Sequence, residues 1–263
     1  MVDGPRILNL DNRLDLIENI SDSEAIERWT KVTGLLRYTL TQKRKKLFGI
    51  EGNIGTGKST LANLLEGEIG VKAFLEDVDN DPVWKLIIET FYSDRIKHGS
   101  RTQLSLIPFR LRQAKDASEC PCSAVIDRTY WADQFVFVPT LVQDGLSQRE
   151  AKNLDKEYKK VYNLFPKVDL MFLLTCSPQT SNQRIIQRAR GIETTTVLTQ
   201  EEIGEDHYLS KIGNLYQALP QTLYDKELYK GPWVVINQDK FKIRDLAHIT
   251  VLLECIADEL KII

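Results

Sequence analysis

The sequence predicts an α/β fold in which helices cover both faces of a five-stranded parallel sheet, with an N-terminal helical extension before it. Three observations support this fold class. Short apolar runs typical of buried strands alternate with helical segments from residue 47 onward. A glycine-rich phosphate-binding motif follows the first apolar run. A separate helix signal precedes that run. Because such alternation favours parallel strands, ligands are expected at the carboxyl edge of the sheet.

Composition limits the functional class. The chain has 263 residues, which suits about one large α/β domain, and it is 42% hydrophobic and 27% charged. A net charge of −2 provides no basic field for nucleic acid. No segment is long and apolar enough to span a membrane, and the N-terminus lacks a signal or transit pattern. We therefore expect a cytoplasmic protein with reduced thiols at Cys120, Cys122, Cys176 and Cys255.

The N-terminal extension, residues 1–45, is expected to contain one helix after an irregular stretch over residues 1–20. Ser21 and Glu24 have the spacing of a helix capping box. Apolar residues then recur at helical spacing: Ile26, Trp29, Val32, Leu36 and Leu40. This apolar stripe requires a partner, which is either the main domain, residues 46–263, or another subunit.

The main domain contains five predicted strands. They are Leu47–Ile50, Val71–Glu76, Ala124–Asp127, Leu170–Leu174 and Trp233–Ile236. Helices are predicted between the strands and, after the last strand, from about Ile243 to Leu260.

The phosphate-binding motif is G-x-x-x-x-G-K-[ST], and it makes the fold P-loop NTPase-type. The loop comprises Gly52, Asn53, Ile54, Gly55, Thr56, Gly57, Lys58, Ser59 and Thr60. Its glycines let backbone N–H groups turn toward phosphate oxygens at a helix N-terminus. Lys58 can reach the β- and γ-phosphates of a bound nucleotide, and the Ser59 hydroxyl can bind Mg²⁺.

Further motifs follow the loop in a characteristic order. They are Phe74–Glu76, Gln103, Asp127–Thr129 and Arg184–Arg190. With Glu51–Thr60, this set resembles the deoxynucleoside kinases of the deoxycytidine, deoxyguanosine and deoxyadenosine kinase type, from about Leu47 to the C-terminus. The resemblance implies ATP-dependent phosphorylation of a deoxynucleoside 5′-hydroxyl, with Mg²⁺, in nucleotide salvage.

The resemblance implies roles for three catalytic residues, Glu76, Arg128 and Lys58. Glu76 is expected to end the second strand and to face the nucleoside 5′-hydroxyl. Arg128 is expected near the transferred phosphoryl group. Asp127 is expected to help hold Mg²⁺ or to orient Arg128. The usual Pro-Val after the glutamate is replaced here by Asp77 and Val78, a departure closer to the bacterial purine kinases.

Residues at the family's substrate positions imply a purine deoxynucleoside or deoxycytidine. Gln103 and Arg110 are seven residues apart and share one helix face. With Asp133 they are expected to read the base edge. Tyr92 and Glu193 resemble the pair that contacts the sugar 3′-hydroxyl. Deoxyadenosine is the first expected substrate, followed by deoxyguanosine or deoxycytidine.

Two further segments resemble parts of the ATP site. Arg184, Arg188 and Arg190 resemble a lid that closes over the polyphosphate and neutralises developing charge. Asp239 and Phe241 follow the last predicted strand and resemble the loop around the adenine of ATP.

Two alternatives remain open from the residues alone. A thymidylate kinase-like nucleoside monophosphate kinase would share the loop, the Asp-Arg pair and the lid. A catalytically silent structural subunit would share the fold.

Homodimers through helices that flank the active site are expected from the resemblance, and the extension could add a second interface to give a homotetramer.

Overall fold

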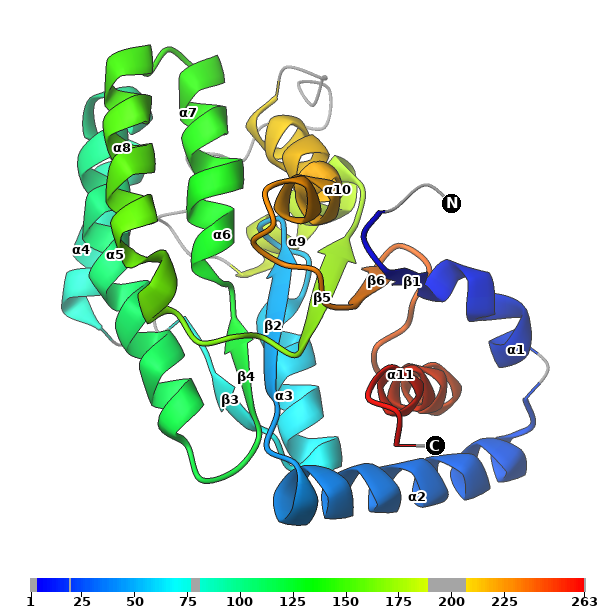
Figure 1. Ribbon diagram of the computed structural model, residues 1–263. Coiled ribbons are helices and arrows are strands. Elements are labelled where there is room, and N and C mark those ends of the chain that lie inside the picture. Colours follow the sequence, from blue (N-terminus) through cyan, green and yellow to red (C-terminus); the bar gives the residue numbers. More distant parts are fainter. Residues whose placement is uncertain (1–3, 19, 77–80, 189–206, 263) are drawn as a thin grey trace.

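The computed structural model describes residues 4–18, 20–76, 81–188 and 207–262. Within them lie the strands β1 (Ile7–Asn9), β2 (Leu47–Gly52), β3 (Lys72–Phe74), β4 (Ala124–Asp127), β5 (Leu170–Thr175) and β6 (Trp233–Asn237). They form one sheet in the order β1-β6-β5-β2-β4-β3, and every described pairing is parallel (Figure 1). This confirms the α/β class with a parallel sheet.

The helices occupy both faces of the sheet. Their bounds are α1 (Leu14–Glu18), α2 (Asp22–Tyr38), α3 (Lys58–Ile69), α4 (Pro82–Ser93), α5 (Arg95–Glu119), α6 (Tyr130–Ala132), α7 (Val138–Gln143), α8 (Gln148–Val161), α9 (Pro178–Arg188), α10 (Tyr208–Asp225) and α11 (Leu246–Glu259). Helices α2, α3 and α11 lie on one face, whereas α5 and α10 pack on the other.

The alternation of side chains along β5 shows why two cores form. Leu170, Phe172 and Leu174 belong to the core with α3 and α11. Met171 and Leu173 point the other way, into the core with α8 and α10. Because successive strand residues face opposite sides, a continuous apolar run is needed where helices cover both faces.

The sheet has six strands where five were predicted. The sixth, β1, comes from the segment predicted to be irregular, and Ile7 and Asn9 pair with Trp233 and Val235 of β6. A run of three residues is too short to show the alternation of apolar and polar side chains that predicts a strand. This strand therefore forms because it pairs with the edge of β6. The second predicted strand is also shorter than expected, because β3 ends at Phe74 and Glu76 lies two residues beyond it.

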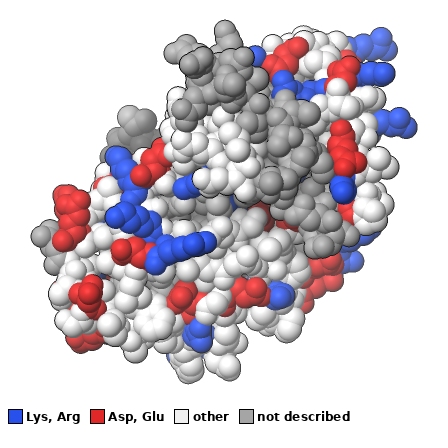
Figure 2. All heavy atoms as spheres, turned by 180° about the vertical axis from the view of Figure 1, so that it is seen from behind, with Lys and Arg blue, Asp and Glu red and all other residues white. Residues whose placement is uncertain are grey.

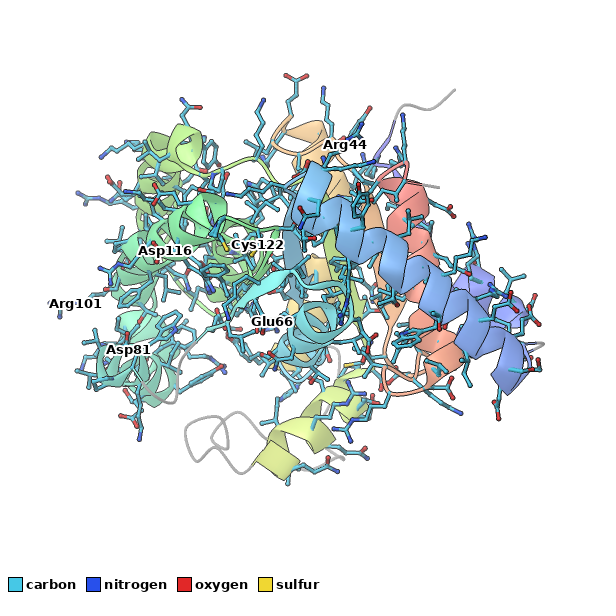
Figure 3. The ribbon with its side chains drawn as sticks, turned by 90° about the horizontal axis from the view of Figure 1, so that it is seen from below. Arg44, Glu66, Asp81, Arg101, Asp116 and Cys122 are labelled. Carbon is cyan, nitrogen blue, oxygen red and sulfur yellow. The ribbon has the colours of Figure 1, made fainter. Side chains whose placement is uncertain are left out.

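Helix α2 packs against its own chain. Its N-terminus is capped as predicted, with the Ser21 hydroxyl accepting from the Glu24 N–H. The helix lies along α11 and α3 (Figure 3). Arg28 forms hydrogen bonds of 2.9 and 2.7 Å with Glu254 of α11. Of the predicted apolar stripe, Ile26 is exposed and the rest is buried or partly buried on the main domain. The stripe therefore no longer argues for a second subunit interface.

The surface agrees with the charge balance of the sequence. In Figure 2, basic and acidic side chains are interspersed over the visible face. No helix in the described part of the chain has the length and apolar character of a membrane span. All four cysteines are free thiols.

Candidate active site

The phosphate-binding loop connects β2 to α3 in a conformation that needs glycine. Gly55 and Gly57 have φ angles of 77° and 90°, in the left-handed region that favours glycine. A Cβ atom on Gly55 would lie 2.7 Å from the Ser181 carbonyl oxygen of α9. Gly57 is the N-cap of α3, so the loop ends at a helix N-terminus, where anions are stabilised.

The loop is held in place by its own side chains and by α10. The Asn53 Oδ1 accepts from the Ile54 N–H at 2.8 Å, and its Nδ2 donates to the Leu209 carbonyl at 2.7 Å. The Thr56 hydroxyl donates to the Asn53 carbonyl at 2.8 Å. These three hydrogen bonds hold the backbone of the loop in its turn. Thr60 is exposed on the first turn of α3.

Lys58, Ser59 and Asp127 lie together below the loop. The Lys58 Nζ donates to the carbonyls of Gly52 and Asn53, at 3.1 and 2.9 Å. The Ser59 hydroxyl donates to the Asp127 Oδ2 at 2.6 Å. The other carboxylate oxygen, Oδ1, is buried without a hydrogen-bond partner among the described residues.

These oxygens fit a divalent cation. Mg²⁺ prefers hard oxygen ligands and is usually held by one or two carboxylates together with substrate phosphates. The Ser59 hydroxyl and the unpartnered Asp127 Oδ1 are donors of that kind. No group of three or more His, Cys, Asp or Glu side chains in the described segments could hold a metal. The phosphate oxygens of a nucleotide would have to complete the coordination.

A cavity of about 890 Å³, including its mouth, opens beside the loop. Its size suits a small-molecule ligand. Six residues predicted to bind or activate substrate line it: Glu76, Tyr92, Gln103, Arg110, Arg128 and Asp133. Lys58, Ser59 and Asp127 line it as well, so the structure brings the predicted phosphate and substrate residues to one cavity.

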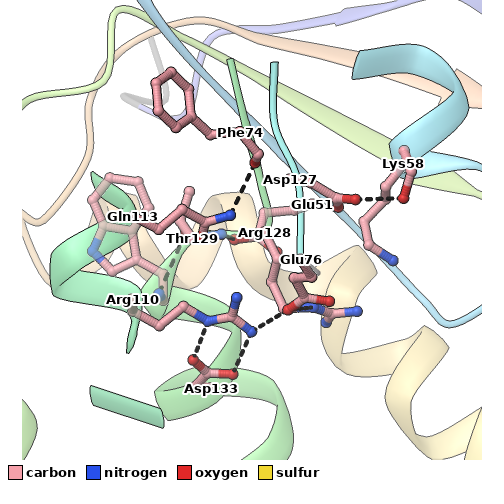
Figure 4. Close-up of polar contacts among 12 residues, drawn as sticks. Glu51, Lys58, Phe74, Glu76, Arg110, Gln113, Asp127, Arg128, Thr129 and Asp133 are labelled. Atoms are coloured by element: carbon pink, nitrogen blue, oxygen red, sulfur yellow. Dashed lines mark hydrogen bonds and ion pairs between the residues drawn. The ribbon is translucent and has the colours of Figure 1, made fainter. Parts of the chain in front are cut away.

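The centre of the cavity is a network of buried charges. The Arg110 Nε lies 2.7 Å from the Asp133 Oδ2, and its Nη2 contacts Glu76 (Figure 4). The Arg128 Nε lies 3.3 Å from the same Glu76 oxygen. Burial acts to raise the pKa of Glu76, but the charges of Arg110 and Arg128 outweigh it and lower the pKa to about 2. Glu76 is therefore an anion at neutral pH.

Arg128 is held in an unusual backbone conformation. Its φ angle is 75°, a left-handed value that is uncommon for a residue with a side chain. Its guanidinium donates to the Tyr216 hydroxyl of α10 and lies 4.9 Å from the centre of the Phe137 ring. The positively charged guanidinium of Arg128 therefore lies between Glu76 and α10, beyond the end of β4.

The residues predicted to read the base have partners that the sequence did not indicate. Gln103 is buried, and its Oε1 accepts from the Tyr158 hydroxyl at 3.2 Å. The Trp84 ring stacks on Phe109 with 5.2 Å between centroids and lies 5.6 Å from the Arg110 guanidinium. Neither Tyr158 nor Trp84 belongs to a motif, and only their tertiary placement identifies them. Tyr216 was missed for the same reason.

The segment predicted to be a lid is described in part. The Arg184 Nη1 donates to the Gly55 carbonyl at 3.3 Å, which places this arginine beside the phosphate loop. The side chain of Arg188, at the end of α9, and residues Arg190 and Glu193 lie outside the described residues.

The loop after β6 brings only one of its two predicted residues to the surface. Asp239 accepts from the Ser177 N–H at 2.7 Å and is exposed. Phe241 is 3% exposed and packs edge-on against His248, with 4.9 Å between ring centroids. The chain turns back into the core after Asp239, so the structure does not present Phe241 at an open face where an adenine could stack.

Comparison with known proteins agrees with this geometry. The family model for deoxynucleoside kinases matches residues 48–256. The chain belongs to the deoxynucleoside kinase family. This deoxynucleoside kinase is 31% identical over 193 residues to a deoxyadenosine kinase of Dictyostelium discoideum, which covers 73% of this chain and 72% of that protein. It is 28% identical over 221 residues to a deoxyguanosine kinase of Lactobacillus acidophilus, covering 81% and 90%.

Solved structures show the same fold. A deoxyadenosine kinase from M. mycoides with bound dATP superposes with a TM-score of 0.62 at 22% identity, covering 82% of this deoxynucleoside kinase and 99% of that chain. The same enzyme with bound dCTP gives a TM-score of 0.60 at 23% identity, covering 82% and 100%. Family membership supports the phosphorylation of a deoxynucleoside that the sequence predicts, and favours it over the nucleoside monophosphate kinase.

Proposed function

We propose that this deoxynucleoside kinase transfers the γ-phosphoryl group of ATP, with Mg²⁺, to the 5′-hydroxyl of deoxyadenosine, and next to deoxyguanosine or deoxycytidine. The observation that carries the substrate class is the buried Arg110–Asp133 pair beside Gln103, in the cavity that also holds Glu76 and Lys58. The names of the two relatives, a deoxyadenosine and a deoxyguanosine kinase, support a purine.

The chemistry of the base edge supports this choice. Adenine and cytosine each present an amino donor next to a ring-nitrogen acceptor. A glutamine amide offers the complementary acceptor and donor side by side. Asp133 accepts from Arg110 and so holds its planar fork of donors in one orientation. Thymine has no amino donor, which makes this set of side chains a poorer match for thymidine.

The reacting end of the cavity is anionic at Glu76 and cationic around it. With its pKa lowered to about 2, the Glu76 carboxylate is a weak base, and we assign it to accept a hydrogen bond from the 5′-hydroxyl and orient it. Phosphoryl transfer has a loose transition state, in which positioning and charge stabilisation dominate. Arg128, Lys58 and the lid residue Arg184 supply positive charge to the transferred group and the leaving phosphates.

The metal and the assembly complete the proposal. Mg²⁺ held by Ser59, Asp127 and the nucleotide would neutralise phosphate charge. Tyr92 lines the cavity and is assigned to the sugar 3′-hydroxyl. Asp239 is assigned to the rim of the adenine site. We place the enzyme in the cytoplasm as a homodimer through helices that flank the cavity.

A coupled assay with ATP and Mg²⁺ tests the function. Deoxyadenosine, deoxyguanosine, deoxycytidine and thymidine are compared as acceptors, with thymidine monophosphate in parallel. We expect the highest kcat/KM with deoxyadenosine. Turnover of thymidine alone would contradict the base-reading roles of Arg110 and Asp133 and leave the kinase activity standing. Turnover of the monophosphate alone would contradict the nucleoside acceptor.

A further inference from the structure

Glu51 is a buried acid that the proposed reaction does not use. It lies in β2, directly before the first glycine of the phosphate loop, and it is 0% exposed. Its Oε1 accepts two hydrogen bonds from Thr129, one from the backbone N–H at 2.9 Å and one from the hydroxyl. Burial raises the pKa of Glu51 to about 7, against the opposing effect of Arg128. Burying a carboxyl group is costly, which points to a specific role for these bonds.

The two bonds hold the turn that carries Arg128. The N–H of Arg128 donates to the Ile50 carbonyl at 2.9 Å, and the N–H of Thr129 donates to the neighbouring Glu51 side chain. These N–H groups belong to the two peptide units on either side of the Arg128 Cα atom. Two adjacent residues of β2 therefore fix both backbone dihedrals of Arg128.

This fixation matters because Arg128 is strained. A left-handed conformation costs a non-glycine residue roughly 1–3 kcal/mol and persists only where its surroundings impose it. The φ angle of 75° is therefore maintained by the contacts of the turn. Glu76 and Tyr216 hold the guanidinium end of the side chain, whereas Ile50 and Glu51 hold the backbone end.

We infer that Glu51 is a positioning residue, which places the Arg128 guanidinium at the transferred phosphoryl group by holding the Thr129 amide and hydroxyl. The inference rests on the proposed role of Arg128. It also links two parts of the site, because the strand that leads into the phosphate loop sets the geometry of the arginine at the end of β4. An error of about 1 Å in such a group can cost on the order of 10²-fold in rate.

Four variants test the inference with deoxyadenosine, ATP and Mg²⁺. Glu51→Ala removes both acceptors, and we expect kcat to fall at least about 10-fold with the Kd values of ATP and nucleoside within about threefold. Thr129→Val removes only the hydroxyl donor and should give a smaller fall. Thr129→Ser keeps both donors and should restore kcat to within about twofold. Thr250→Val is the matched control, because Thr250 is equally buried and donates to the Leu246 carbonyl in α11.

A double-mutant cycle separates positioning from folding. If Glu51 acts through Arg128, adding Glu51→Ala to Arg128→Ala should lower kcat by less than about threefold further. If the fall in kcat of the double variant equals the product of the falls in the two single variants, the inference is wrong. A Glu51→Ala enzyme that, like Thr250→Val, loses only melting temperature would also overturn the inference. A weakened ATP Kd with normal kcat would assign Glu51 to the phosphate loop instead. If Glu51→Ala does not fold, Thr129→Val replaces it in the cycle with Arg128→Ala, and Thr129→Ser serves as the variant that keeps both donors. The same comparison of kcat values then tests the inference.

Comparing Arg128→Ala with Glu51→Ala separates a failure of this inference from a failure of the proposed function on which it rests. An Arg128→Ala enzyme with normal kcat would overturn the role of Arg128 and the inference with it. A slow Arg128→Ala beside a fast, folded Glu51→Ala would overturn only the inference.

Discussion

The guanidinium of Arg110 contacts the carboxylate of Glu76 inside the cavity. The residue predicted to read the base and the residue predicted to face the 5′-hydroxyl thus form one buried ion pair. Asp133 holds the other edge of the same guanidinium, at 2.7 Å. Because removing one member of such a network changes the surroundings of the others, we expect base recognition and reaction to be coupled in this site.

Glu76→Gln should lower kcat by about 10²- to 10³-fold and change the nucleoside KM little. The amide is uncharged and a weaker hydrogen-bond acceptor for the 5′-hydroxyl than the carboxylate. Arg110 keeps its bonds to Asp133, so the fold should persist. Steady-state kinetics and circular dichroism check this expectation. A folded variant with unchanged kcat would remove Glu76 from the reaction.

The pH dependence of Glu76 follows from its lowered pKa. Its value in the folded protein, about 2, lies below the ordinary 4.5. The stability that its ionisation contributes is therefore fully present above about pH 4.5 and is lost as the pH falls toward about 2. The difference in melting temperature between wild type and Glu76→Gln should be constant from pH 8 to 5 and shrink below about pH 4.5. A difference that changes between pH 6 and 8 would contradict the lowered pKa.

The Arg110–Asp133 pair should behave non-additively. Asp133→Ala leaves a buried guanidinium with one partner fewer, and breaking a buried ion pair costs about 3–5 kcal/mol. Arg110→Leu combined with Asp133→Ala removes both charges and should be more stable than Asp133→Ala alone. Denaturant unfolding of the wild type, Asp133→Ala and the double variant measures their free energies of unfolding. The double variant should also lose its preference for deoxyadenosine over thymidine, seen as a ratio of kcat/KM values.

Ser59→Ala should raise the Mg²⁺ concentration for half-maximal rate by about 10-fold or more. The substitution removes one oxygen ligand and frees Asp127 from its 2.6 Å hydrogen bond, and loss of groups in or around a metal site typically costs 10- to 100-fold in metal affinity. Rate is measured against free Mg²⁺ at saturating ATP. Asn63→Ala, exposed on the same helix, is the control and should match wild type. An unchanged Mg²⁺ requirement would exclude Ser59 as a ligand.

Two glycines, one in the phosphate loop and one inside α3, should respond in opposite directions. Gly55→Ala forces a side chain into a left-handed conformation, 2.7 Å from a carbonyl oxygen, and should destabilise the enzyme by about 1–3 kcal/mol and weaken ATP binding. Gly67→Ala, inside α3 with nothing within 4 Å, should stabilise it by about 0.5–1 kcal/mol. Thermal unfolding with and without ATP compares them. A Gly55→Ala variant as stable as Gly67→Ala would contradict the strain argument.

The sequence by itself determined the elements whose signals are local. The spacing from Gly52 to Ser59 requires a tight turn into a helix, and the apolar runs of β2, β4, β5 and β6 are long enough to be recognised as buried strands. The capping residue Ser21 likewise located the start of α2 correctly. The signals for these features lie in neighbouring residues alone, so they can be read from the sequence without knowledge of tertiary contacts.

Tertiary structure decided what depends on distant partners. Strand β1 exists because the edge of β6 accepts it, and Phe241 is buried because the chain turns back against His248. Tyr158 and Tyr216, the partners of Gln103 and Arg128, come from helices far along the chain and belong to no motif. The bond between Glu51 and Thr129 joins two motifs that are far apart in the sequence. Long-range packing places their side chains and sets the electrostatic field that keeps Glu76 ionised, and neither can be read from local spacing.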